Sequence, residues 1–230
     1  YEIASCLVGS EMCIRDSLIT DRKNHIYNRR NVVKWRKRKS AENGETADLE
    51  KEETNMYFGV QMYGVSKEWK QDPEGFLKKI YEAGYRQIEP CLGFRVDARD
   101  YGFWIPEDLE QAMPLLAKYH IEVHAVHIFL DEYHYERELA ILTELAQKYH
   151  ISWFVVKSPA RLTKDVLDET VARYRELAEE LEKAGAGLLV HNEKEDICIR
   201  VNGKTAYEYL LEACGEKVGA EVDAGWMYCG

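Results

Sequence analysis

Apolar runs recur at nearly constant spacing along the chain, and amphipathic stretches separate them. The runs begin near Tyr57, Arg86, Ile121, Ser152, Gly187 and Lys217. A helix-patterned stretch follows each run except the last. Continuous apolar runs of this length are typical of strands that are buried on both faces of a parallel sheet. The pattern therefore predicts a serial βα repeat, with about five βα units and a sixth strand.

The boundaries of the predicted elements follow from local signals. In the first unit, Asp72 is placed to cap a helix that starts at Pro73, and Gly84 is placed to end it. The predicted strands are 57–63, 87–90, 121–128, 153–157, 187–191 and 218–222. The predicted later helices are 106–119 with an irregularity at Pro114, 135–149, 167–184 and 205–214.

Two architectures accommodate such a repeat, a doubly wound sheet and a (β/α)8 barrel. The first strand is not followed by GxGxxG or GxxxxGK[ST], the usual marks of nucleotide binding in a doubly wound sheet. Polar residues instead end several strands, as at the catalytic face of a barrel. They are Gln61, Glu89, His127, Lys157, His191 and Asp223. A barrel takes about 250 residues, so we expect an incomplete TIM barrel over residues 56–230.

Residues 1–55 differ from the rest, and we expect them to be a non-native or disordered extension. The stretch 28–39 is strongly basic and 41–55 is acidic and polar, which is typical of solvated coil. Residues 1–17 resemble translated sequencing-adapter sequence. Residues 51–55 are compatible with an in-frame bacterial ribosome-binding site, so we expect translation to start at Met56 in a bacterial gene. A nucleic-acid-binding arm is the alternative for the basic run.

Composition argues against nucleic acid and membranes as partners of the chain and against disulfide bonds within it. The net charge of −10 argues against nucleic acid as a partner, because binding to phosphate needs a basic face. No apolar run reaches the roughly 20 residues that span a bilayer. The six cysteines form no CxxC pair and no disulfide-scaffold spacing, so we interpret them as reduced thiols of a cytoplasmic protein.

Several motifs, in order, resemble the sugar phosphate isomerase/epimerase family, whose members are xylose isomerase-like TIM barrels. The resemblance covers the chain from Met56 onward. The matching segments are 59–63, 72–75, 83–89, 191–192, 202–205, 209–211 and 221–226.

The resemblance implies a divalent metal at the mouth of the barrel, with Mn²⁺, Mg²⁺, Zn²⁺ and Co²⁺ as the candidates. The family draws its ligands from strands five to eight, and Asp223 lies at the strand-six position. Glu193 replaces a histidine that is frequent in strand five, and we expect it to be a second metal ligand and a catalytic carboxylate. The structural alternatives are that Asp223 caps a turn and that Glu193 belongs to a solvated loop.

Five further residues are candidates for contact with a carbohydrate substrate. His127 and His191 lie in strands three and five, and Trp226 offers an apolar wall for a sugar face. The alternatives are a hydrogen-bonded interior histidine for His127 and a packing role for Trp226. Glu89 and Lys157 are suited to bind sugar hydroxyls or phosphate, or to pair with each other. His124 shares a side with His127 only if strand three is irregular, since three residues separate them.

The resemblance implies an isomerase or epimerase of a sugar, sugar phosphate or keto-sugar, working by proton transfer next to a carbonyl. A metal-dependent lyase, dehydratase or hydrolase is the first alternative, because one fold hosts several chemistries. A non-catalytic sugar-binding barrel is the second. Two metal ligands and one base would come from strands seven and eight, so we expect the 230-residue chain itself to be inactive and poorly stable. Whether it forms a homo-oligomer stays open.

Overall fold

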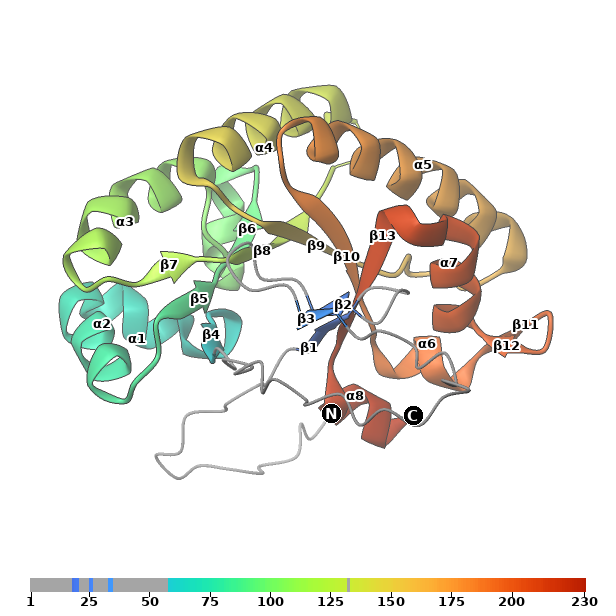
Figure 1. Ribbon diagram of the computed structural model, residues 1–230, viewed down its shortest axis with the longest axis horizontal. Coiled ribbons are helices and arrows are strands. Elements are labelled where there is room, and N and C mark those ends of the chain that lie inside the picture. Colours follow the sequence, from blue (N-terminus) through green and yellow to red (C-terminus); the bar gives the residue numbers. More distant parts are fainter. Residues whose placement is uncertain (1–17, 21–24, 27–32, 35–57, 132) are drawn as a thin grey trace, which may run out of the picture.

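The strands form a curved parallel sheet, and a row of helices follows its outer side (Figure 1). The computed structural model describes residues 18–20, 25–26, 33–34, 58–131 and 133–230. The helices along the outside of the arc are α2 (Pro73–Glu82), α3 (Pro106–Lys118), α4 (Tyr135–Tyr149), α5 (Lys164–Lys183) and α7 (Ala206–Cys214). Helices on one side only are the arrangement of the predicted barrel, whereas a doubly wound sheet carries helices on both faces.

The parallel strands follow one another around the arc in the order of the sequence. They are β4 (Gly59–Gln61), β5 (Gln87–Glu89), β6 (Cys91–Gly93), β7 (Glu122–Val123), β8 (Ala125–Phe129), β9 (Trp153–Lys157), β10 (Gly187–His191) and β13 (Val218–Val222). One sheet runs β4-β5-β7 and the other runs β13-β10-β9-β8-β6. Every pairing between these strands is parallel. Among the described residues β4 and β13 do not pair, so the predicted incomplete barrel is confirmed.

Predicted strand two ends at Pro90 but is followed at once by β6, and predicted strand three is interrupted once. At these two places the chain passes from one sheet to the other. Pro90, which has no N–H to donate, separates β5 from β6. His124 separates β7 from β8, which is the irregularity in strand three that the spacing of His124 and His127 requires. A backbone bond from His127 N to Pro90 O, 2.9 Å long, continues the ladder across the break.

The predicted helix boundaries have clear local causes. The Asp72 carboxylate accepts a hydrogen bond from Gly75 N (2.9 Å) and caps α2. Gly84 has φ of +97°, the left-handed conformation that glycine adopts most readily after a helix. Helix α3 continues through Pro114. The short elements are η1 (Tyr63–Val65), α1 (Ser66–Gln71), η2 (Val96–Tyr101), α6 (Lys194–Cys198), β11 (Arg200–Val201), β12 (Lys204–Thr205), η3 (Gly215–Lys217) and α8 (Ala224–Cys229).

Two apolar layers hold the sheet. The larger cluster packs the outer face of the strands against the helices, with Leu77, Leu109 and Leu142 fully buried. The smaller cluster lies on the inner face and consists of Ala125, Val155 and Leu189, with Trp153 beside it. Layers of inward-facing side chains from neighbouring strands are the packing expected inside a barrel.

The edge of β13 that faces away from β10 is covered by a further strand. Strand β1 (Leu18–Thr20) pairs antiparallel with β13. Strands β2 (His25–Ile26) and β3 (Val33–Lys34) pair with each other. The backbone groups of an edge strand are a ready template for a further strand, which accounts for the pairing. The adapter-like segment, most of the basic run and residues 35–57 lie outside the described residues.

Removing residues 1–55 tests the predicted domain boundary. From composition we expect a chain that starts at Met56 to melt at the same temperature as the 230-residue chain. Differential scanning calorimetry of the two proteins measures this. A drop of several degrees would show that the β1–β13 pairing stabilises the sheet and that the boundary is wrong.

The structure bears on the cysteines and on membrane spans only within its described residues. There, Cys91, Cys198, Cys214 and Cys229 carry thiols rather than disulfides, whereas Cys6 and Cys13 lie outside it. Within the same residues no helix combines the length and the apolar character that a membrane span requires.

Candidate functional site

Five ionisable side chains are buried together where the strands end on the inner side of the sheet. We call them the polar cluster, and they are Glu89, His127, His191, Glu221 and Asp223. Their exposed fractions range from 4% for Glu221 to 9% for Asp223. Charged groups are seldom buried without a partner or a ligand, so this concentration marks a site.

The alternation of side chains along the strands brings the cluster together. Along β8, Ala125 belongs to the inner apolar layer and His127 follows two residues later. Along β10, Leu189 belongs to that layer and His191 follows in the same way. Because residues two apart face the same side of a strand, the histidines extend the inner face beyond its apolar layer. Glu221 lies directly opposite His191 in the register of β13 with β10.

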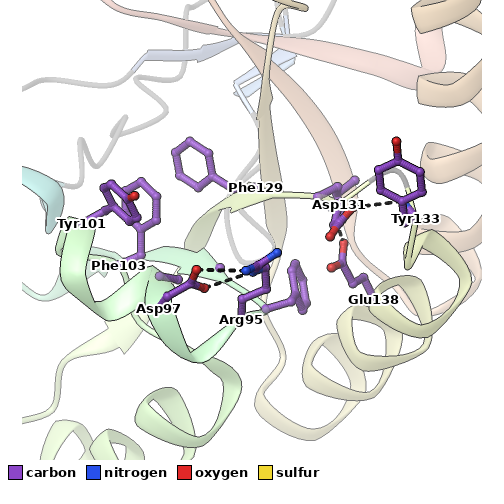
Figure 2. A pocket seen from close by; sticks show the side chains of 12 residues that line it. Arg95, Asp97, Tyr101, Phe103, Phe129, Asp131, Tyr133 and Glu138 are labelled. Atoms are coloured by element: carbon purple, nitrogen blue, oxygen red, sulfur yellow. Dashed lines mark hydrogen bonds and ion pairs between the residues drawn. The ribbon is translucent and has the colours of Figure 1, made fainter.

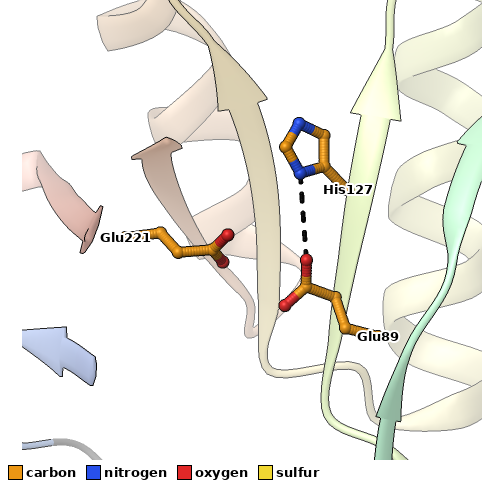
Figure 3. Close-up of side chains that lie close together, drawn as sticks. All are labelled: Glu89, His127 and Glu221. Atoms are coloured by element: carbon orange, nitrogen blue, oxygen red, sulfur yellow. Dashed lines mark ion pairs between the residues drawn. The ribbon is translucent and has the colours of Figure 1, made fainter. Parts of the chain in front are cut away.

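Three members of the cluster approach each other as metal ligands do. One ligand atom each from Glu89, His127 and Glu221 lies within 4.8 Å of the others. Figure 3 shows the two carboxylates pointing toward each other across the interior, with the imidazole of His127 above Glu89. The distance from His127 Nδ1 to Glu89 Oε1 is 3.8 Å, and neither atom has a hydrogen-bond partner among the described residues.

The other two members form a second pair beside this group. His191 Nε2 is 3.5 Å from Asp223 Oδ2, and the rings of His127 and His191 meet edge to face at 5.2 Å. Burial, and then the nearby His127, lower the pKa of His191 below its ordinary value. Burial therefore favours the neutral form of His191, in which one ring nitrogen can accept a proton.

Two neighbours fix the backbone that carries the acidic residues. Asn192 is fully buried, and its side chain accepts from Asp223 N (2.8 Å) and donates to Asp223 O (3.2 Å). These bonds extend the pairing of β10 and β13 beyond the last strand residues. The hydroxyl of Tyr207 in α7 donates to the carbonyls of Val190 (2.8 Å) and Glu221 (3.1 Å). Its burial raises the phenol pKa, so the hydroxyl stays protonated as a donor.

Of the two predicted metal ligands, one lies inside the polar cluster and the other lies outside it. Asp223 lies in the cluster. Its Oδ1 also accepts a hydrogen bond from Trp226 N (2.9 Å), so Asp223 caps α8, which is the structural role given above as the alternative to metal binding. Glu193 lies at the entrance, just after β10, with its Oε1 3.9 Å from Lys157 Nζ. Both assignments stay predictions, and Glu193 also stays a predicted catalytic carboxylate.

The candidate substrate residues divide in the same way. Glu89, His127 and His191 are in the cluster, whereas Lys157 and Trp226 lie at its margin with partly exposed side chains. Glu89 and Lys157, whose mutual pairing was the alternative to substrate binding, have other partners in the described chain, since His127 approaches Glu89 and Glu193 approaches Lys157. The sequence reasoning missed Glu221 as a site residue. Its position two residues before Asp223 in one strand is the signal that identifies it.

The donor set fits a divalent cation. Two carboxylates and an imidazole suit Mn²⁺, Zn²⁺ or Co²⁺. Ligand atoms on one such ion lie roughly 3–4.5 Å apart, which small side-chain rotations reach from the observed separations. The buried atoms Glu89 Oε1 and His127 Nδ1, which lack a hydrogen-bond partner in the described chain, are the ones that such an ion would satisfy.

A pocket of about 460 Å³ lies next to the cluster, at the ends of β6 and β8 (Figure 2). We call it the rim pocket. Glu138, at the start of α4, closes one side of it and is only 2% exposed. Glu138 Oε2 accepts a hydrogen bond from Asp131 N (2.7 Å) and so holds the end of the β8 segment. Burial raises the pKa of the Glu138 carboxyl above its ordinary value.

Glu138→Gln is expected to change how stability depends on pH. The unfolded carboxyl releases its proton near pH 4.3, whereas the folded one releases it at higher pH. Over that interval the folded state binds more protons, so this group makes the protein less stable as pH rises. The amide has no such titration, so the variant should gain stability relative to the parent as pH rises above about 4.3.

Urea unfolding at several pH values measures that difference. Glu136→Gln is the matched control, because Glu136 lies exposed in the same helical turn. A difference between Glu138→Gln and the parent that stays constant with pH would contradict the assignment.

Comparison with known proteins supports the fold. No known family profile matches the sequence. No curated protein matches it either. A sugar phosphate isomerase/epimerase from Parabacteroides distasonis has a similar structure, with a TM-score of 0.61 and 21% identity over 75% of this chain and 66% of its own.

Two further solved structures are similar to the chain. An L-ribulose 3-epimerase has a TM-score of 0.53 and 17% identity over 75% of this chain and 62% of its own. A xylose isomerase domain-containing protein from Salmonella typhimurium has a TM-score of 0.51 and 15% identity over 70% of this chain and 58% of its own. The chain thus spans less than two thirds of their lengths. The comparisons confirm the predicted fold, an incomplete TIM barrel.

Proposed function

We propose that the chain carries the active-site face of a metal-dependent isomerase or epimerase that acts on a sugar, a sugar phosphate or a keto-sugar. The observation that carries the proposal is the approach of Glu89, His127 and Glu221 to within 4.8 Å inside the sheet. Strands two, three and six supply these groups at their C-terminal halves, where barrel enzymes place their catalytic residues.

A divalent ion bound by these three residues would supply Lewis-acid stabilisation of the negative charge that develops on a carbonyl oxygen. The sequence-based prediction adds Asp223 and Glu193 as ligands. The position of Asp223 supports its role as a ligand, because its carboxylate is buried in the cluster with Oδ2 3.5 Å from His191 Nε2. Three buried carboxylates within one cluster repel each other, and a cation offsets that repulsion.

The remaining side chains have roles in binding and proton transfer. Burial favours the neutral imidazole of His191, which accepts a hydrogen bond from a sugar hydroxyl or donates one to it. Glu193 is half-buried at the entrance, where a carboxylate takes a proton from a carbon next to the carbonyl and returns it. Lys157, 3.9 Å from Glu193, donates to a sugar oxygen or a phosphate. Trp226 offers its ring to an apolar sugar face.

Deuterium exchange tests this proposal at the step of proton removal. The chain is incubated with D-fructose and a panel of other ketoses in D₂O containing Mn²⁺, and NMR follows the proton on the carbon next to the carbonyl. Exchange requires one base, whereas net epimerisation requires proton return on the opposite face. We therefore expect the chain with Mn²⁺ to catalyse exchange, which reports proton removal by one base whether or not net epimer forms.

The exchange should depend on Mn²⁺ and be lost in Glu193→Gln. Glu195→Gln is the matched control, because Glu195 is exposed and two residues away. Equal exchange with and without the protein would refute the proposal. Ketose binding without exchange would favour the non-catalytic sugar-binding barrel, and loss of water from the sugar would favour a dehydratase.

A further inference from the structure

The rim pocket is joined to the polar cluster by a line of stacked rings. The rings of His127 and Phe129 lie 5.3 Å apart at 20°, and those of Phe129 and Phe103 lie 4.2 Å apart at 11°. His127 belongs to the cluster, whereas Phe129 and Phe103 line the rim pocket. The pocket therefore begins one ring away from the groups proposed to carry the chemistry.

The pocket combines flat rings with hydrogen-bonding groups. Its lining includes the side chains of Arg95, Asp97, Tyr101, Phe103, Phe129 and Asp131 (Figure 2). Tyr101 is 70% exposed although it is aromatic. A volume of about 460 Å³ falls within the range of about 300–1,000 Å³ that small-ligand sites occupy. Aromatic faces beside a few polar groups match a sugar ring, which has apolar C–H faces and a polar rim of hydroxyls.

The charges of the pocket favour a neutral ligand over a phosphate. The Arg95 guanidinium binds Asp97 with two contacts of 3.1 Å, so a carboxylate already neutralises it. Asp131 adds a further carboxylate to the lining, and its oxygens already accept from Tyr133 N (2.9 Å) and contact His134 Nδ1 (3.1 Å). A phosphate group would compete with Asp97 for Arg95 and face Asp131, whereas hydroxyl groups donate to both carboxylates.

We propose that the rim pocket binds a second, neutral sugar ring, so that the substrate is a two-ring carbohydrate. The ring with the carbonyl lies at the polar cluster, and the other ring stacks on Phe103 and Tyr101. This inference rests on the proposed function for the identity of the first ring. It extends that function by naming a glycoside-linked ketose, rather than a free or phosphorylated monosaccharide, as the substrate class.

Calorimetric titration of the 230-residue chain with Mn²⁺ present tests the inference. The probes are D-fructose, maltulose (a glucose ring joined to fructose), D-fructose 6-phosphate and methyl α-D-glucopyranoside. We expect maltulose to bind at least about tenfold more tightly than D-fructose, from the added stacking and hydrogen bonds. Phe103→Ala should remove most of that advantage and leave D-fructose binding unchanged.

Tyr101→Ala repeats the test at an exposed position, where the substitution does not affect the core. Tyr228→Ala is the matched control, an exposed tyrosine in α8 that does not line the pocket. Equal binding of maltulose and D-fructose, or tighter binding of D-fructose 6-phosphate than of maltulose, would overturn the inference. Binding of the methyl glucoside that depends on Phe103, without any binding of D-fructose, would uphold the pocket and refute the proposed function.

Discussion

Glu221→Gln is expected to weaken Mn²⁺ binding by at least about 100-fold. The change keeps the size of the side chain but removes the charge from one of the three groups within 4.8 Å of each other. Loss of an outer-shell partner alone typically costs 10–100-fold in affinity, and loss of a charged ligand should cost more. Calorimetric titration of the 230-residue chain with Mn²⁺ measures the affinity directly, without requiring turnover.

Glu89→Gln in the same titration identifies which residues hold the ion. Only the group found in the structure includes Glu89, whereas the prediction from sequence includes Asp223 and Glu193 instead. We expect Glu89→Gln to weaken binding as strongly as Glu221→Gln does, and Glu195→Gln, at an exposed position, to leave it unchanged. Unchanged affinity in Glu89→Gln and Glu221→Gln would mean that the ion does not bind at this group.

Asp223→Ala and Glu193→Gln test the assignment made from sequence. We expect Asp223→Ala to abolish tight binding, because it removes a buried charge from the cluster and the partner of His191. We expect Glu193→Gln to weaken binding less, since Glu193 lies at the entrance beside Lys157. Retained affinity in Asp223→Ala would show that Asp223 serves only to cap α8.

The sequence predicted those parts of the fold that depend on local signals. The bounds of β9, β10, β13 and α4 agree with the predicted ranges 153–157, 187–191, 218–222 and 135–149. Each has a continuous apolar run or a long amphipathic stretch with a clear end. The Asp72 cap and the Gly84 turn were also predictable, since each depends on the conformational preference of a single residue.

The parts that the sequence did not predict depend on contacts between distant segments. The breaks at Pro90 and His124 divide the curved sheet in two, and they arise from how neighbouring strands pair around the arc. The pairing of β1 with β13 joins segments about 200 residues apart and leaves no periodic signal. Glu221 was missed because an acidic residue in a strand gains meaning only when Glu89 and His127 are known to face it.

Asn192→Ala is expected to lower the free energy of unfolding by about 3 kcal/mol. Asn192 is fully buried, and its amide makes two hydrogen bonds to the backbone of Asp223. Its removal leaves a buried N–H and a buried C=O without that partner, at about 1–3 kcal/mol each, partly offset by water that enters the space. Urea unfolding followed by circular dichroism measures the loss, and Gln71→Ala, an exposed amide at the end of α1, should stay within about 0.5 kcal/mol of the parent.

The same substitution should also weaken Mn²⁺ binding, although Asn192 is not one of the proposed ligands. Its two bonds fix the residue that follows β13, and with it the direction of the Asp223 carboxylate toward His191. Positioning partners of this kind typically contribute 10–100-fold to metal affinity. If Asn192→Ala lowers stability but leaves the Mn²⁺ affinity unchanged, then Asn192 serves only to stabilise the fold. If the free energy of unfolding falls by less than about 1 kcal/mol, then water replaces the hydrogen bonds of its amide.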